Sequence, residues 1–352
     1  MYTTGTAPNN NINRRSLQSF FTESNNVPFV ARCWLTMYEQ IPGKYPLVVV
    51  LDENIPVCTN NRNLDLSFMF VSFFFFVGLR FITVYILIIF FGWPEKATVT
   101  KEVAGSCVGI CHSTLLCSGL IVAFVTTKKY DVAAKLDSQT TTTATTTTTN
   151  CGIGGGKWWI LFADLLLQFC SGYMMYDAML NIFWIRWNPT VSLLTFELND
   201  DDILFLLHHC TASFYMISAR IIGAGYQSAM ICMLLGEVTN PLMNMYLIGE
   251  YASKTDCCYS IDAQWLHYGI TVAFAVTYNL IRVVISPPII AGVTYSLLFT
   301  KNGRTNVPLP LNLFWNLLIW SVCFGSASWI IKCHQIISDF LAIQQEQQHH
   351  DL

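Results

Sequence analysis

Residues 66–92 read LSFMFVSFFFFVGLRFITVYILIIFFG, and this stretch decides the class of fold. It is 27 residues long and contains a single charged residue, Arg80. A helix of about 20 apolar residues spans the hydrocarbon core of a bilayer. Phenylalanine and β-branched residues also favour strands, but a lone strand of this length would leave its backbone groups without partners in lipid. The stretch therefore predicts a transmembrane helix.

The rest of the chain has the composition of a multipass membrane protein. Of its 352 residues, 53% are hydrophobic and only 12% are charged, which is about half the charged share of an average soluble protein. This composition excludes an ordinary soluble enzyme and predicts an all-α integral membrane fold with about seven transmembrane helices. We place these helices at residues 66–92, 103–127, 158–187, 203–222, 226–248, 265–300 and 311–332.

The sixth of these runs has two interpretations. Residues 265–300 are too many for one upright crossing, and Pro287 and Pro288 interrupt them. We interpret the run as one long span, kinked or ending near the prolines and followed by a re-entrant or interfacial segment. A pair of short crossings is the alternative, and it would move the C-terminus to the other side of the membrane.

Three segments are expected outside the membrane. Residues 1–65 form an Asn-rich arm, partly disordered and partly interfacial, and residues 336–352 form a polar tail. Residues 128–157 hold a Thr tract and a Gly triplet, which cannot bury enough surface to order the chain. Lysines and arginines on the N-terminal side outnumber those on the other side by eight to five, which favours a cytoplasmic N-terminus with the Thr-rich insertion on the same side.

The charge and the cysteine content of the chain limit the kinds of partner and site that we expect. The net charge is −3 and no basic run exceeds two residues, so a nucleic-acid partner is not expected. The 13 cysteines form no CxxC pair. We therefore predict neither a metal site nor a redox motif, and expect the cysteines to serve as small apolar fillers.

Polar side chains inside the spans are the candidate functional residues, because each is costly in lipid unless it faces the bundle interior and has a partner. Helical periodicity places Tyr173, Asp177 and Asn181 on one stripe and directs Asp164 away from it. We predict that nine polar residues from five helices converge on one region inside the bundle: His112, Tyr173, Asp177, His208, His209, Glu237, Asn240, Asn244 and Arg282.

Three local features add to this picture. Pro241 has no N–H, so the carbonyl of Glu237 loses its helical donor and the kink becomes a polar feature of the bundle. Gly105 and Gly109 are four residues apart, a spacing that permits close contact between helices. Arg80 is expected to pair or to snorkel within the bundle.

The polar residues also have a purely structural interpretation. A carboxylate of Asp177 or Glu237 paired with Arg282 would lock helices together without a role in function. His112 would likewise act as a hydrogen bonder between helices. For the adjacent His208 and His209 a functional role is favoured, because imidazoles titrate near physiological pH.

Three motifs follow one another in order: SGYMMYD at 171–177, LHH at 207–209 and GEVTNPLMN at 236–244. Together with His112 and Arg282, they resemble the TLC family of multipass, lipid-related membrane proteins over residues 100–335. The resemblance implies a barrel-like bundle of six helices around a central cavity for a lipid chain, with one extra helix in front. It also implies a location in the endoplasmic reticulum or another endomembrane.

The resemblance implies two functions. Ceramide synthases of this family carry two aspartates three residues apart on the helix after the paired histidines, where this chain has Glu237 and Asn240. The chain is therefore more similar to the non-synthase members, which implies binding of membrane lipids and an influence on lipid composition, sensing or trafficking. The alternative is an acyltransferase of ceramide synthase type that uses acyl-CoA as substrate and no cofactor. There His208 or His209 would take a proton from a sphingoid amine while Glu237 holds the imidazole. A channel or transporter ranks last, because no inverted repeat is evident.

Overall fold

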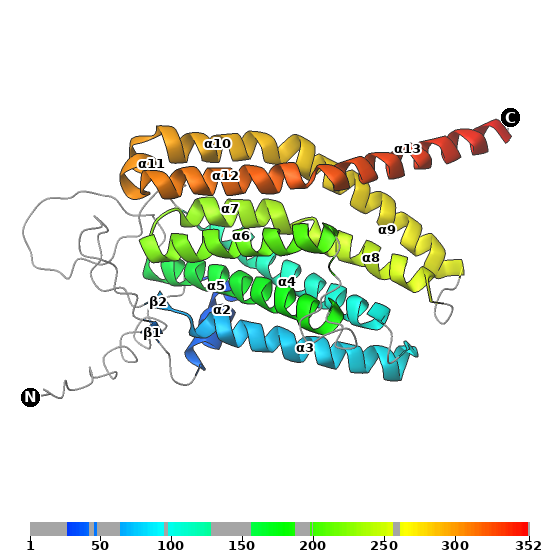
Figure 1. Ribbon diagram of the computed structural model, residues 1–352, viewed down its shortest axis with the longest axis horizontal. Coiled ribbons are helices and arrows are strands. Elements are labelled where there is room, and N and C mark those ends of the chain that lie inside the picture. Colours follow the sequence, from blue (N-terminus) through cyan, green and yellow to red (C-terminus); the bar gives the residue numbers. More distant parts are fainter. Residues whose placement is uncertain are drawn as a thin grey trace, which may run out of the picture.

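A computed structural model describes residues 27–41, 46–47, 64–94, 98–127, 156–186, 198, 200–255 and 261–350 (Figure 1). Two paired strands of two residues each, β1 (Pro46–Leu47) and β2 (Leu64–Asp65), are the strands within these ranges. The helices are α2 (Phe29–Glu39), α3 (Ser67–Phe91), α4 (Thr98–Val125), α5 (Gly156–Leu180), α6 (Asp200–Ile222), α7 (Tyr226–Glu237), α8 (Asn240–Ser253), α9 (Ile261–Asn279), α10 (Ser286–Phe299), α11 (Lys301–Asn306), α12 (Leu309–Gly325) and α13 (Ala327–His350). Two π-helical segments, η1 (Asn181–Arg186) and η2 (Leu280–Ile285), continue α5 and α9.

The long helices lie side by side along the longest direction of the molecule, and α13 projects beyond the others (Figure 1). Six helical stretches are long and apolar enough to cross a membrane: Ser67–Phe91, Thr98–Val125, Trp158–Arg186, Tyr226–Ser253, Ala263–Phe299 and Leu309–Ala342. Helix α6 is not among them, but it packs against α5 and lies alongside the rest of the bundle. The predicted all-α multipass membrane fold is confirmed.

The structure resolves the two interpretations of residues 265–300. Helix α9, the π-helical η2 and α10 follow without interruption as one stretch, Ala263–Phe299. The pair of short crossings is therefore wrong, and so is a re-entrant segment, because the chain does not reverse after the prolines. An interfacial position of α10 stays a prediction. Pro287 and Pro288 stand in the first turn of α10, where a missing N–H is tolerated. Immediately before them, η2 has the wider turn of a π-helix, a conformation often found at functional sites.

The fifth span is broken where the sequence has Pro241. Helix α7 ends at Glu237, and α8 begins at Asn240 with the proline in its first turn. Val238 and Thr239 form the turn between the two helices. The break places a short polar stretch of backbone in the middle of a membrane-spanning segment, beside the Glu237 carboxylate.

The predicted extramembrane segments fall mostly outside the described residues, which begin at 27 and resume at 156 after the Thr-rich insertion. Within the N-terminal arm, however, the structure has α2, a helix that the sequence analysis did not foresee. It packs on α5, where the ring centroids of Trp34 and Phe169 lie 4.7 Å apart. The expected polar tail is helical, because α13 continues to His350.

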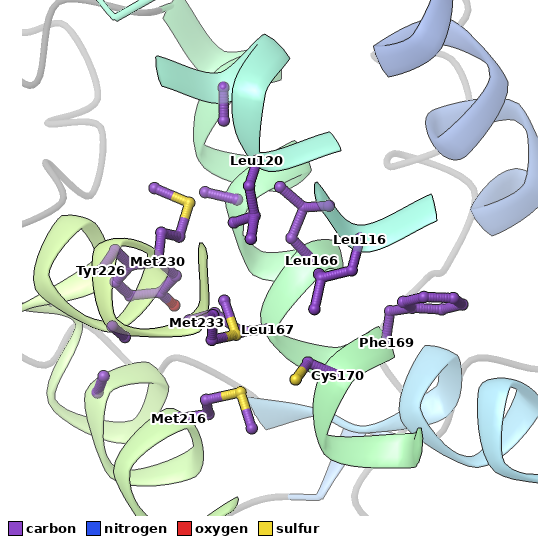
Figure 2. Packing of buried hydrophobic residues seen from close by; sticks show 14 of the residues in the cluster. Leu116, Leu120, Leu166, Leu167, Phe169, Cys170, Met216, Tyr226, Met230 and Met233 are labelled. Atoms are coloured by element: carbon purple, nitrogen blue, oxygen red, sulfur yellow. The ribbon is translucent and has the colours of Figure 1, made fainter. Parts of the chain in front are cut away.

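A hydrophobic core fills the bundle near the end where α4 finishes and α5 begins. Figure 2 shows the side chains of four helices meeting there: Leu116 and Leu120 of α4, Leu166, Leu167, Phe169 and Cys170 of α5, Met216 of α6, and Tyr226, Met230 and Met233 of α7. A buried ion pair holds the same end. Asp164 Oδ1 lies 2.7 Å from Nε of Arg220 and accepts a hydrogen bond from the Tyr226 hydroxyl at 3.0 Å. Asp164 thus helps to hold α5 against α6 and α7, away from the predicted polar stripe.

The glycine that allows two helix backbones to touch is not one of the pair, Gly105 and Gly109, that the sequence analysis identified. A Cβ atom at Gly172 of α5 would lie 2.5 Å from the backbone oxygen of Met69 in α3, so these two helix backbones are in contact. At Gly105 and Gly109 of α4, the atoms that fill the space belong to the side chains of Arg80 and Asn244. The predicted GxxxG spacing therefore accommodates polar side chains.

Candidate functional site

A cavity of about 710 Å³ lies inside the bundle and is lined by residues of nine α-helices, α3 to α9, α12 and α13, and of the π-helical segments η1 and η2. It extends to the end of the bundle where α4 and α6 begin and where α8 ends. Its charged mouth there includes Glu102, Arg186 and Asp202. Arg186 bridges the other two, with Nη2 3.5 Å from a Glu102 oxygen and Nε 2.9 Å from an Asp202 oxygen.

His209 of α6 lies on the inner wall with one nitrogen occupied by its own helix. Its Nδ1 is 2.9 Å from the carbonyl oxygen of Phe205, and because a carbonyl only accepts, Nδ1 carries a proton. Its Nε2 faces Oδ2 of Asp177 at 3.4 Å. The Asp177 carboxylate therefore lies beside the edge of the imidazole ring that is turned away from Phe205.

Arg80 of α3 holds the other oxygen of Asp177. Its Nη1 lies 3.8 Å from Asp177 Oδ1 and 3.4 Å from the Tyr176 hydroxyl, and its Nη2 donates to the carbonyl of Lys101 at 2.8 Å. The side chain is 2% exposed. Its guanidinium sits against Gly105, where a Cβ atom would lie 2.8 Å from Nη2. Arg80 therefore pairs within the bundle and does not snorkel.

Glu237 forms a second polar cluster at the end of α7. Its Oε2 is 3.0 Å from the hydroxyl of Ser113 and 2.9 Å from Nδ2 of Asn240, and His112 Nδ1 lies 3.6 Å away. His112 is fully buried and stacks on the ring of Tyr173, with centroids 3.7 Å apart. The Glu237 carboxylate is thus held mainly by α4.

A smaller chamber of about 90 Å³ continues inward from the cavity. His208, Glu237 and Arg282 line both spaces. Beyond them most of the chamber wall is apolar, with side chains such as those of Met216 and Ile319. The cavity therefore passes from a charged mouth through a ring of ionisable groups into an apolar interior.

The structure places eight of the nine predicted site residues on the wall of the large cavity: Tyr173, Asp177, His208, His209, Glu237, Asn240, Asn244 and Arg282. His112 lies behind the wall, between Tyr173 and Glu237. Asn181 lines the cavity as well, whereas Asp164 does not. The expected stripe thus faces the cavity, and Asp164 points elsewhere.

Two expected partnerships differ from those in the structure. Glu237 was expected to hold the imidazole of His208 or His209, but its nearest imidazole is that of His112, and a backbone carbonyl orients His209. Arg282 was expected beside a carboxylate, but Nη2 donates to the carbonyl of Gly236 at 2.9 Å. Within the described parts of the chain, the ion pairs of Asp177 and Glu237 are with other residues.

Two residues of the site were not predicted. Arg80 lies on the cavity wall. The signal in the sequence was that Arg80 is the one charged residue within residues 66–92. Ser113 contacts Glu237, but serines are common between membrane helices and the sequence offered no signal. Metal binding has no support in the described residues, where no group of three or more His, Cys, Asp or Glu side chains is arranged to hold an ion.

A family model described as the TLC domain matches residues 102–334, which is about two thirds of the chain. The match begins inside α4 and ends inside α13. It therefore includes α4 with His112 and α6 with His208 and His209, and it leaves out α3 with Arg80. No individual curated protein and no solved structure matches the chain significantly.

Proposed function

The chain belongs to the TLC-domain family of multipass membrane proteins, and from this premise we propose that it binds an amphipathic membrane lipid in the central cavity. Through this binding it influences the composition, sensing or trafficking of lipids in its membrane. The endoplasmic reticulum or another endomembrane is the proposed location.

One observation carries this proposal, namely the change in character along the cavity. The mouth is lined by Glu102, Arg186 and Asp202, and the inner chamber by side chains such as Met216 and Ile319. An amphipathic molecule matches this order, because its polar end keeps hydrogen-bonding partners while its tail enters the apolar part. An ion or a small polar solute would leave the inner chamber without a role.

Lipids that co-purify with the protein test this proposal. Ala212 lines the inner chamber, and a phenylalanine there would fill space that a tail needs. Ala291 is exposed on α10, so Ala291→Phe is the matched control. Mass spectrometry of protein purified in mild detergent should find a defined lipid with the unmodified chain and with Ala291→Phe, and much less with Ala212→Phe. Equal lipid content in all three proteins would contradict binding in the chamber.

A second candidate function, acyl transfer from acyl-CoA to a sphingoid amine, is favoured by the geometry of His209. His209 lines the cavity, and its Nε2 lies 3.4 Å from Oδ2 of Asp177. A carboxylate beside an imidazole suits a general base, because it stabilises the imidazolium that forms when the base takes a proton. In this reaction Nε2 takes the proton of the attacking amine, the thioester C–S bond breaks, and an amide and the free thiol of CoA are formed.

Two substitutions separate the candidates. An acyltransferase should lose amide formation by about 10²–10⁴-fold in His209→Ala, with the protein still folded. In a lipid-binding protein Glu237→Gln should be mild, because the amide can keep the hydrogen bonds with Ser113 and Asn240. We favour this second outcome, since Asn240 stands where the synthases have another carboxylate. Robust ceramide formation by the purified protein that is lost in His209→Ala would overturn this preference.

A further inference from the structure

The inner chamber contains polar groups that the contacts described so far leave without an ionic partner. Arg282, Ser286 and His208 all line this chamber, although most of its other wall residues are apolar. In a low-dielectric interior such groups are costly unless something bonds to them. Their presence on the wall of a cavity points to a ligand.

Arg282 is the clearest case. Its Nη2 is bonded to the neutral carbonyl of Gly236, and its guanidinium lies 5.4 Å from the ring centroid of Tyr278. Its Nε is buried and has no hydrogen-bond partner among the described residues. The charge of Glu237 acts on it only at longer range. A charged donor next to open space is therefore available.

Ser286 lies one turn further along the same helical stretch and is 1% exposed. Its hydroxyl has no partner in the described structure. Serines in membrane helices usually donate to the carbonyl four residues earlier, as Ser113 does to Gly109 here. The preceding turn at Ser286 is the π-helical η2, and that internal bond is not made. The hydroxyl is thus a second free donor on the chamber wall.

We propose that Arg282, Ser286 and His208 bind the negatively charged head group of a single-chain lipid, a carboxylate or a phosphate monoester, with the tail in the inner chamber. An arginine and a hydroxyl offer the two or more donors that such an anion accepts. The tail runs toward Met216 and Ile319, away from the charged mouth. This inference rests on the proposed lipid binding and specifies the class of lipid.

Tyr215 lines the inner chamber and is fixed by its neighbours. Its hydroxyl donates to Ser228 at 2.7 Å, and its ring lies 4.6 Å from that of Trp315, whose indole donates to Ser218 at 2.8 Å. These contacts give the apolar tail a rigid aromatic ring to pack against.

Binding of three probes with the same chain tests the proposal: hexadecanoate, hexadecyl phosphate and hexadecanol. The full-length protein in mild detergent should bind the two anions at least about tenfold more tightly than the alcohol, the effect of one charge-assisted hydrogen bond. Arg282→Gln should abolish this preference, Ser286→Ala should reduce it, and Arg282→Lys should keep part of it. Arg304→Gln is the matched control, because Arg304 is exposed on α11 and lines neither the cavity nor the chamber, and it should keep the full preference.

The outcomes are distinct. Equal binding of alcohol and anions, or loss of the preference in Arg304→Gln as well as in Arg282→Gln, overturns the anion site and leaves lipid binding intact. Competition by inorganic phosphate at the concentrations at which hexadecyl phosphate binds overturns the assignment to a lipid head group. Failure of all three probes to bind refutes the proposed lipid binding itself.

Discussion

At the scale of single residues, Arg80 is a charge in the middle of the most apolar helix of the bundle. Insertion of an arginine at the centre of a membrane helix costs about 2.5–3.5 kcal/mol, and the structure offsets this with the Asp177 carboxylate, the Tyr176 hydroxyl and the Lys101 carbonyl. Asp177 in turn faces His209. Helix α3 lies outside the matched domain, yet it supplies one end of this chain of polar contacts.

The first prediction follows from that chain. Arg80→Gln should lower the stability of the protein in detergent by about 3 kcal/mol, because it leaves the Asp177 carboxylate without one of its partners. Asp177→Asn should be less harmful in the Arg80→Gln background than alone. A double-mutant cycle on apparent melting temperatures measures this coupling. The same cycle on the more exposed pair Lys332 and Glu250 should give a smaller coupling, about 1 kcal/mol or less, and purely additive effects for Arg80 and Asp177 would contradict the prediction.

Periodicity identified which residues face inward but not which of them meet. Helical arithmetic fixes the direction of a side chain around its own axis, and this sufficed to place Asp177 on the cavity side and Asp164 elsewhere. The pairing of Asp177 with Arg80 depends on which helices are neighbours, and this information is not contained in the spacing of one helix. The same holds for Glu237, which we expected beside the paired histidines and which lies against α4.

At the scale of the elements, the packing of α3 on α5 depends on one glycine. A Cβ atom at Gly172 would lie 2.5 Å from the Met69 oxygen and 2.9 Å from Cβ of Ser72, and the first of these is backbone that cannot move aside. Gly172 belongs to the SGYMMYD segment and precedes Tyr173 on the cavity wall. The glycine therefore sets the distance between the α3 and α5 backbones, and with it the position of Arg80 on the cavity wall.

The second prediction is that Gly172→Ala destabilises the protein. Overpacking of this kind costs about 1–3 kcal/mol, which should lower the apparent melting temperature by several degrees. Gly78 is a suitable control, because it also lies in a membrane helix of this pair and a Cβ atom there meets nothing within 4 Å. Gly78→Ala should leave the melting temperature unchanged or slightly raised. Similar losses for both substitutions would mean that helix contact at Gly172 is not the cause.

The length and apolar character of the runs predicted most helices closely, since lipid forces a backbone to satisfy its own hydrogen bonds. The failures have physical reasons. Prolines at 287 and 288 suggested an ending, but they stand in the first turn of α10, directly after the π-helical η2, where their missing N–H groups cost little. Helix α2 was missed because its 11 residues are too short to stand out from an Asn-rich arm, and because its packing on α5 is a tertiary effect.

At the scale of the whole molecule, α6 decides the number of crossings. By length and composition alone, six stretches qualify as spans and α6 does not. Its first turn holds Asp200, Asp201 and Asp202, and its middle holds His208 and His209. These polar groups lower its hydropathy, but Asp202 lies at the cavity mouth and His208 and His209 lie on the cavity wall. Buried polar groups do not oppose insertion as lipid-facing ones do, because they keep their partners inside the bundle.

The third prediction is therefore that α6 crosses the membrane and that the two ends of the chain lie on opposite faces. Helix α5 leads toward the cavity mouth and α7 starts at the opposite end of the bundle (Figure 1), so the chain must return between them along α6. Epitope tags added before residue 1 and after residue 352, probed with antibodies in selectively permeabilised cells, report the two faces. A third tag within the Thr-rich insertion at residue 145 should share the face of the N-terminal tag, because α3 begins and α4 finishes at the same end. If the terminal tags proved to lie on one face, the number of crossings would be even, and Asp202 of α6 would belong to an interfacial helix instead of to the wall of a membrane-embedded cavity.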